Sequence, residues 1–424
     1  MKIYLSDEVK TVIEQFAAYG YTAYAVGGCA RDSLLSATPK DWDVCSPATP
    51  EMTKEIFKDF KVIDTGIRHG TVTVLVNDKP IEITTFRTEG AYSDRRHPDF
   101  VSFTADIAED LKRRDFTINA MAYNPAMGLV DIAGGQEDLK NKLIRTVGNA
   151  NERFSEDPLR ILRALRFSAS LGFKIENKTA ESVLTLYPLL GDIAAERIFA
   201  ELRLLLCGEN LYYVLSEFTD VFCFLFPEIS HSFKDANTCT FFGEEMNLSP
   251  SQIFEAVAAV KDVFSLRAAM LFSAASISDA EKIALRLRFD RATTGRILNL
   301  LEAVNNPIPT DKPSMKRLIN SYGFETVSDY LLSAEALSKV LKDGYADIFG
   351  RLVGARVDFE EIKQKGEAVE IKDLHVTGND IKKLGYKGTE VGRVLSFLLD
   401  AVIDGRIQNK KQDLLDFARR YSSD

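Results

Sequence analysis

The chain has 424 residues, of which 46% are hydrophobic and 27% charged, and its net charge is −9. This length predicts two or more domains with ample cores, and no stretch is long and apolar enough to predict a membrane span. The N-terminus, MKIYLSDEVK, turns acidic after five residues and does not resemble a signal peptide. Five widely spread cysteines without a CxxC pair, and four scattered histidines, argue against a disulfide framework or a zinc site. These features predict a cytoplasmic protein.

The N-terminal part of the chain mixes strand and helix patterns up to about residue 125. Helices are expected over 6–19 and 29–35, and strands over 22–27, 41–45, 70–76 and 80–86. The last two strands flank Asn77-Asp78-Lys79, which predicts a hairpin turn.

After about residue 135, the apolar spacing becomes helical and convincing strand patterns disappear. The expected helices are 156–172, 178–188, 194–206, 252–264, 279–288, 293–304, 326–340 and 390–403. The sequence therefore predicts an α+β head, a mixed sheet with helices, followed by an all-α remainder.

The segment AYAVGGCARDSLLSATPKDWDV, residues 23–44, holds the first candidate site. If Asp41 and Asp43 lie on one strand they share a face, with their roots about 7 Å apart, and carboxylates this close can hold Mg²⁺ for nucleotidyl transfer. Gly27-Gly28 would let backbone approach a triphosphate, and Arg31 follows them. A lone Asp-x-Asp is also typical of a solvated strand end or turn.

The second candidate site is DLKRRDFTINAMAYN, residues 110–124. A helix through this run would place Asn119 on the same face as Asp115. Arg114 suits phosphate, while Asp115 and Asn119 suit ribose hydroxyls. The alternative is that Asp115 only caps a helix and the arginines are solvated.

The third candidate site is FSEDPLRILRALRF, residues 154–167, which contains Glu156, Asp157 and Arg160. An Asp acceptor and an Arg donor three residues apart on a helix face the same side and match the pairing edges of both C and A. Uracil and guanine would leave buried polar groups unpaired. Asp157 before a proline is also a typical helix N-cap, and both roles can hold together.

These three segments, in this order, resemble the DNA polymerase β-like nucleotidyltransferases, in the form of the class II tRNA nucleotidyltransferases, which are the CCA-adding enzymes and the bacterial poly(A) polymerases. The resemblance is dense over 22–205 and returns at 374–409. It implies a head (1–135), a neck that recognises the base (136–212), a body (213–350) and a tail that binds tRNA (351–424).

The resemblance implies template-independent addition of CCA to tRNA from CTP and ATP, with two Mg²⁺ ions held by Asp41 and Asp43. Glu82 is a candidate third metal ligand, although a buried structural acid is an equal alternative. Arg114 and Asp115 would recognise the sugar, and Glu156, Asp157 and Arg160 would select the base. The nucleotide-binding residues implied altogether are Gly27, Gly28, Arg31, Arg114, Asp115, Asn119, Asp157, Arg160, Arg163 and Arg166. In AAERIFAEL, residues 194–202, the charged Glu196, Arg197 and Glu201 are expected to form structural ion pairs.

The segment RTEGAYSDRRHP, residues 87–98, is expected to be a mobile loop beside the site, which changes the pocket between C and A addition. Its expected members are Arg87, Glu89, Gly90, Asp94, Arg95 and Arg96. An ordinary surface loop is the alternative.

The expected partner is tRNA, bound at its acceptor stem and elbow, with no obligate protein partner. The negative net charge makes local basic clusters, such as Lys382-Lys383 and Lys410-Lys411, the expected RNA contacts. Alternatives are an A-adding enzyme working with a separate CC-adding enzyme, a poly(A) polymerase, and a non-catalytic RNA-binding relative.

Overall fold

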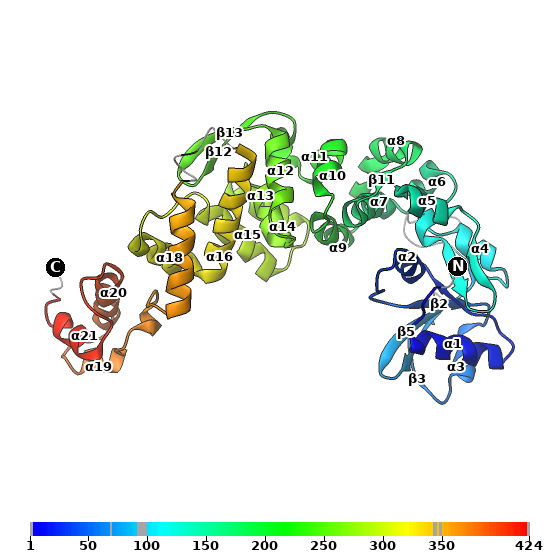
Figure 1. Cartoon of the computed structure of the whole chain (residues 1–424), viewed down its shortest axis with the longest axis horizontal. Helices are drawn as coiled ribbons and strands as arrows, with labels where there is room; N and C mark the ends of the chain where they lie inside the picture. Colours follow the sequence, from blue (N-terminus) through cyan, green and yellow to red (C-terminus); the bar gives the residue numbers. More distant parts are fainter. Residues whose placement is uncertain (1–2, 68–69, 91–99, 342–345, 347–349, 422–424) are drawn as a thin grey trace. The chain divides into compact units, whose positions relative to one another are not determined.

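A computed structural model describes residues 3–67, 70–90, 100–341, 346 and 350–421 (Figure 1). The chain forms two compact units, Met1–Phe224 and Leu225–Asp424. An N-terminal mixed sheet with helices precedes a helical region, which confirms the predicted fold class. The finer division into head, neck, body and tail stays a prediction.

The N-terminal unit contains a seven-stranded sheet in the order β3-β4-β5-β2-β1-β8-β9. Only β2 and β5 pair in parallel, and the other neighbours are antiparallel. The strands are β1 (Tyr24–Val26), β2 (Asp43–Ser46), β3 (Lys61–Gly66), β4 (Thr71–Val76), β5 (Lys79–Thr85), β8 (Met121–Asn124) and β9 (Gly128–Asp131). Asn77 and Asp78 between β4 and β5 both have positive φ (52° and 61°), as a tight hairpin turn requires, so the predicted hairpin is confirmed.

Helices pack on this sheet, and the apolar residues that recur on one side of a helix are buried against it. In α1 (Asp7–Ala18), Ser6 caps the first turn and a stripe that includes Val9, Val12 and Phe16 is buried in the main core of the sheet. A smaller core, which includes Tyr24, Cys45 and Phe86, forms with Leu111 of α4 (Ile107–Lys112). The remaining elements here are α2 (Gly28–Leu34), α3 (Pro50–Ile56), β6 (Arg87–Glu89), β7 (Val101–Phe103), the 3₁₀ turn η2 (Thr117–Asn119) and α5 (Gly135–Asn141).

The rest of the N-terminal unit is helical, with one short parallel strand pair. Its elements are β10 (Leu143–Ile144), α6 (Ala150–Glu156), α7 (Leu159–Leu171), β11 (Lys174–Ile175), α8 (Asn177–Leu186), η3 (Tyr187–Asp192), α9 (Ala195–Leu206), α10 (Leu211–Glu217) and α11 (Thr219–Leu225). Helices α7 and α9 pack directly on each other. This pair carries many of the charged residues of the site.

The C-terminal unit consists mainly of helices. They are η4 (Pro227–Phe233), α12 (Pro250–Ala259), α13 (Phe264–Leu271), α14 (Ile277–Arg286), α15 (Arg291–Ala303), α16 (Lys312–Leu341), α18 (Leu352–Lys365), η5 (Ile371–Asp373), α19 (Gly378–Lys382), α20 (Glu390–Ile403) and α21 (Lys411–Ala418). Helix α20 has the predicted bounds, whereas α16 is broken at Gly323, whose φ is 79°.

The expectation of an all-α remainder was wrong in two places. The pair β10–β11 and the antiparallel hairpin of β12 (Asn237–Phe241) and β13 (Glu244–Leu248) both follow residue 135. In this hairpin Cys239 and Met246 are buried, as expected for strands that alternate between buried and exposed residues. This short alternation was not recognised in the sequence.

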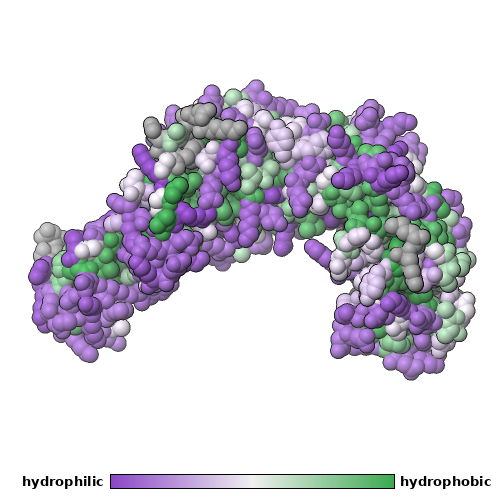
Figure 2. Space-filling model, in the orientation of Figure 1, coloured by the Kyte–Doolittle hydropathy of each residue, from purple (hydrophilic) through white to green (hydrophobic). Residues whose placement is uncertain are grey.

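The last helices, α19–α21, share an apolar core of their own, and the face of them visible in Figure 2 is mostly hydrophilic. In the described part of the chain, no helix has both the length and the apolarity needed to cross a membrane.

Candidate active site

The two predicted metal carboxylates lie at the start of β2, but only Asp43 belongs to the strand. Asp41 lies in a bend before it, so the prediction that one strand carries both was wrong. The expected alternation nevertheless holds, because Trp42 packs against the core of the sheet while both aspartates are exposed. The two carboxylates are therefore both available to solvent or a ligand.

Glu82 on β5 is the parallel register partner of Asp43. Its side chain is exposed between the buried Ile81 and Ile83, so the alternative of a buried structural acid is wrong. Partial desolvation raises the pKa of Asp43, the negative charge of Glu82 raises it further, and Arg114 offsets part of the effect, while Asp41 adds a smaller increase. Asp43 therefore lies near two further carboxylates and one arginine.

The described residues contain no group of three or more His, Cys, Asp or Glu side chains placed to hold a metal ion. Mg²⁺ is commonly bound by only one or two carboxylates, with water and substrate phosphate supplying the other oxygens. Asp41 and Asp43 fit this second type of site by their chemistry and exposure, and a direct metal contact of Glu82 stays a prediction.

Gly27 has a structural reason to be glycine. Its φ is 79°, and a Cβ there would lie 3.1 Å from Nη1 of Arg114. Gly28, the first residue of α2, has neither restriction. Arg31 on α2 donates to Asn119 Oδ1 (2.7 Å) and pairs with Asp32 (2.7 Å), so this guanidinium is fixed before any ligand arrives.

Asp110 is a site residue that sequence reasoning missed. Its fully buried carboxylate pairs with Arg113 (2.7 Å) and Arg114 (3.2 Å) and accepts a hydrogen bond from the backbone of Arg87. Asp110 lies three residues before Arg113 and four before Arg114, and this helical spacing could have predicted the two ion pairs. Asp110 therefore orients Arg114, which had been assigned to the sugar.

Asp115 and Asn119 come together as predicted, but without an α-helix. Asn119 ends the 3₁₀ turn η2, and its Nδ2 donates to Asp115 Oδ1 (3.3 Å). The other carboxylate oxygen accepts two hydrogen bonds from Arg163 of α7, at 2.8 and 2.6 Å. Burial opposes ionisation of Asp115, but the charge and hydrogen bonds of Arg163 prevail and hold its pKa at about 2.

The expected base-selecting residues lie around the junction of α6 and α7. Asp157 was predicted to lie on the same helix face as Arg160, but it precedes α7. Its carboxylate accepts a hydrogen bond from the backbone N–H of Leu159, which is a capping role. The same carboxylate pairs with Arg197 of α9 (3.2 Å). Arg160 is buried and donates to Glu156 (2.9 Å). Asp157 and Arg160 are therefore held by different residues, Arg197 and Glu156.

Three arginines surround the ring of Phe167 on α7. The guanidinium carbons of Arg31, Arg163 and Arg166 lie 5.2, 5.4 and 4.1 Å from the ring centroid. Glu201 of α9 pairs with Arg166 (2.6 Å) and lies 3.6 Å from Arg163. Arg163 and Arg166 are thus positioned by acids of this chain.

The loop prediction was wrong for its first residues. Arg87 and Glu89 belong to β6, which pairs with β7, and Glu89 also pairs with Arg113 (2.9 Å). Gly90 donates to the Phe100 carbonyl through its backbone N–H, and a Cβ on it would clash with the Phe100 ring. Asp94, Arg95 and Arg96 lie outside the described residues.

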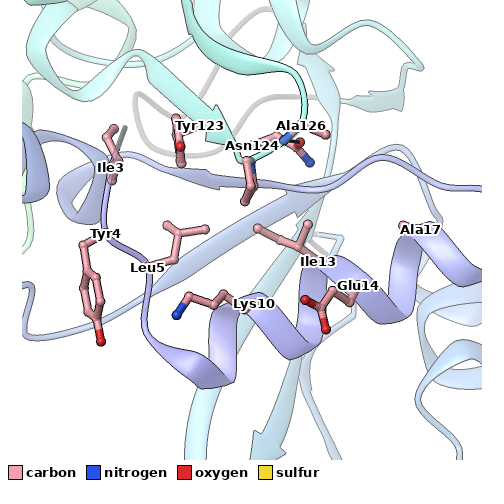
Figure 3. Close-up of a pocket in the computed structure, with 11 residues that line it drawn as sticks. Ile3, Tyr4, Leu5, Lys10, Ile13, Glu14, Ala17, Tyr123, Asn124 and Ala126 are labelled. Carbon is pink, nitrogen blue, oxygen red and sulfur yellow. Dashed lines mark hydrogen bonds between the residues drawn. The ribbon is translucent and has the colours of Figure 1, made fainter. Parts of the chain in front are cut away.

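A separate cavity of about 650 Å³ lies between residues 3–5, α1 and the turn after β8 (Figure 3). Its lining is mainly apolar, with Lys10 and Glu14 at α1, and includes none of the predicted site residues. The predicted nucleotide site is therefore a different part of the unit.

Three family models match the chain. The poly A polymerase head domain matches 23–145, an RNA- and SrmB-binding site of polymerase A matches 172–232, and tRNA nucleotidyltransferase domain 2 matches 265–418. A CCA-adding enzyme of Enterococcus faecalis is 35% identical and covers 98% of this chain and 96% of its own. One of Streptococcus mutans is 36% identical, covering 98% and 97%. The crystal structure of the Bacillus stearothermophilus CCA-adding enzyme in complex with CTP is 27% identical, with a TM-score of 0.74 over 97% of this chain and 96% of that one.

Proposed function

The chain belongs to the family of CCA-adding enzymes, and from this premise we propose that it completes the 3′ end of tRNA by adding C, C and A from CTP and ATP. The observation that carries the proposal is the similarity, over almost the whole length, to relatives that bear this name. The exposed carboxylates of Asp41 and Asp43 support a catalytic chain over a non-catalytic RNA-binding one.

Asp41 and Asp43 would hold Mg²⁺. Glu82 beside them would either coordinate the metal directly or strengthen the local negative charge. Bound Mg²⁺ would supply Lewis-acid activation of the primer hydroxyl and neutralise the triphosphate. Gly27, the residue before α2, would let the backbone approach the triphosphate closely, and Arg31 on α2 is held by Asp32 and Asn119.

Recognition of the nucleotide would be divided between two carboxylates. Asp115 would bind ribose hydroxyls, and Asp157 with Arg160 would match the pairing edges of C and A. Both carboxylates already contact arginines, Asp115 with Arg163 and Asp157 with Arg197, which reduces the free energy needed to organise the site when the nucleotide binds.

The basic residues of the last helices would contact tRNA, including its elbow. Lys382, Lys383, Lys410, Lys411, Arg419 and Arg420 are all exposed. This binding would weaken steeply with salt, because it depends on phosphate contacts. The similarity to CCA-adding enzymes also supports the proposed division into a head (1–135), a neck (136–212), a body (213–350) and a tail (351–424).

The test uses purified chain, Mg²⁺ and a tRNA transcript that ends at the discriminator base. We expect two C residues with CTP alone, and CCA with CTP and ATP together. An A-adding enzyme would extend only a transcript already ending in CC, and a poly(A) polymerase would add long A tails to unrelated RNA. Either result would replace the proposal.

A further inference from the structure

Helix α9 carries two charged residues, Arg197 and Glu201, that lie four residues apart and so point to the same side of the helix. Neither had been expected to take part in nucleotide selection. Glu201 is 9% exposed. A buried carboxylate is stable only when neighbouring groups compensate its charge.

The compensation of Glu201 comes from α7. Its Oε2 lies 2.6 Å from Nε of Arg166, and its Oε1 lies 3.6 Å from Nη1 of Arg163. Arg163 in turn uses Nε and Nη2 for Asp115 Oδ2. A continuous row of alternating charges therefore runs from Asp115 through Arg163 and Glu201 to Arg166.

We propose that Glu201 is a positioning residue for sugar selection: it holds Arg163 so that Arg163 fixes the Asp115 carboxylate for the ribose hydroxyls of the incoming nucleotide. The proposal deepens the function proposed above and depends on it. Without the charge of Glu201, Arg163 and Arg166 repel each other over the Phe167 ring with no acid between them. Arg163 then adopts other rotamers, and Asp115 loses the partner that orients it.

Arg197 provides the matched comparison on the same helix. It contacts Asp157, on the base-selecting side, at 3.2 Å. The row that starts at Asp115 and the pair of Asp157 with Arg197 use different acids and different arginines. A general weakening of α9 would lower selectivity for both the sugar and the base, whereas a positioning role of Glu201 affects selectivity for the sugar alone.

The decisive measurement is kcat/KM for CTP, dCTP and UTP on tRNA lacking CCA, in the parent chain and in Glu201→Gln and Arg197→Gln. Glutamine keeps the shape of glutamate, removes its charge and replaces one acceptor oxygen with an N–H donor group. We expect Glu201→Gln to lower the preference for CTP over dCTP by about tenfold or more, mainly through a higher KM for CTP, while the preference over UTP changes less than about twofold. Arg197→Gln should leave the preference over dCTP unchanged.

Two further variants separate positioning from folding. Glu201→Asp keeps the charge and should restore most of the preference for CTP over dCTP. In an Asp115→Asn background, Glu201→Gln should change this preference no further, because the carboxylate on which it acts is gone. The inference is overturned if Glu201→Gln leaves sugar preference intact or lowers both preferences equally. A parent chain that adds nothing to tRNA would instead refute the proposed function.

Discussion

The carboxylates of the N-terminal unit occupy two contrasting environments. Beside and on the sheet, Asp41, Asp43 and Glu82 are exposed, and the pKa of Asp43 is raised first by partial desolvation and then by the negative charges of Glu82 and Asp41. At the helices, Asp115 and Glu201 are largely buried, and each contacts an arginine of α7. Acids of the second kind each contact an arginine of the chain, whereas the exposed acids of the first kind are open to a ligand from outside it. The first set is suited to chemistry on a metal-bound substrate, and the second to holding a shape that selects it.

The largest effect is expected at the sheet. Asp43→Asn should lower incorporation of C and A alike by about a thousandfold or more, because it removes a proposed metal carboxylate. Single-turnover incorporation into tRNA measures the effect, and a gel-shift assay should show unchanged tRNA binding. Activity within about tenfold of the parent would contradict the metal assignment.

A smaller effect on rate, but a clear one on fidelity, is expected at the helices. Asp157→Asn should raise incorporation of UTP relative to CTP by about tenfold or more, because an amide no longer offers only acceptors to the base. Competition between the two nucleotides on one tRNA measures it. Unchanged fidelity with a loss of about 1 kcal/mol in stability would leave only the capping role of Asp157.

The comparison also predicts opposite effects on stability. The pKa of Asp115 falls from 3.8 to about 2 on folding, so its contribution is present above pH 3.8 and is lost as the pH falls toward 2. Asp115→Asn should therefore lower the free energy of unfolding by about 2 kcal/mol at neutral pH. The pKa of Asp43 is raised, so its ionised form disfavours the folded chain at neutral pH, and Asp43→Asn should leave stability unchanged or increase it.

Urea unfolding followed by tryptophan fluorescence tests this contrast, because Trp42 is the single tryptophan and packs, partly buried, against the core of the sheet. Equal destabilisation by both substitutions would show that the two environments do not differ as described.

The smallest effect is expected at Glu82. Glu82→Gln should raise the Mg²⁺ concentration needed for half-maximal activity by about tenfold at most, because it removes a neighbouring charge and leaves Asp41 and Asp43 in place. A magnesium titration of the incorporation rate measures this. A loss as large as that of Asp43→Asn would make Glu82 a required metal ligand.

Local signals were sufficient for many elements and for the motif residues. Ser6 and a buried stripe define α1, and Asn77-Asp78 defines the turn between β4 and β5. The pairing of Asp115 with Asn119 was also predictable, because the two are four residues apart, although the backbone there is a 3₁₀ turn. The β12–β13 hairpin was missed because each of its strands shows only a short alternation.

The sequence by itself determined which residues are the candidates for the chemistry, because motif spacing is a property of neighbouring positions. The tertiary structure decided what orients them. Asp115 and Arg163 are 48 positions apart, and Asp157 and Arg197 are 40 apart. Periodicity indicates which side of a helix is polar but not which helix lies opposite it. Only the packing of α7 against α9 brings Glu201 to the arginines whose charge it balances.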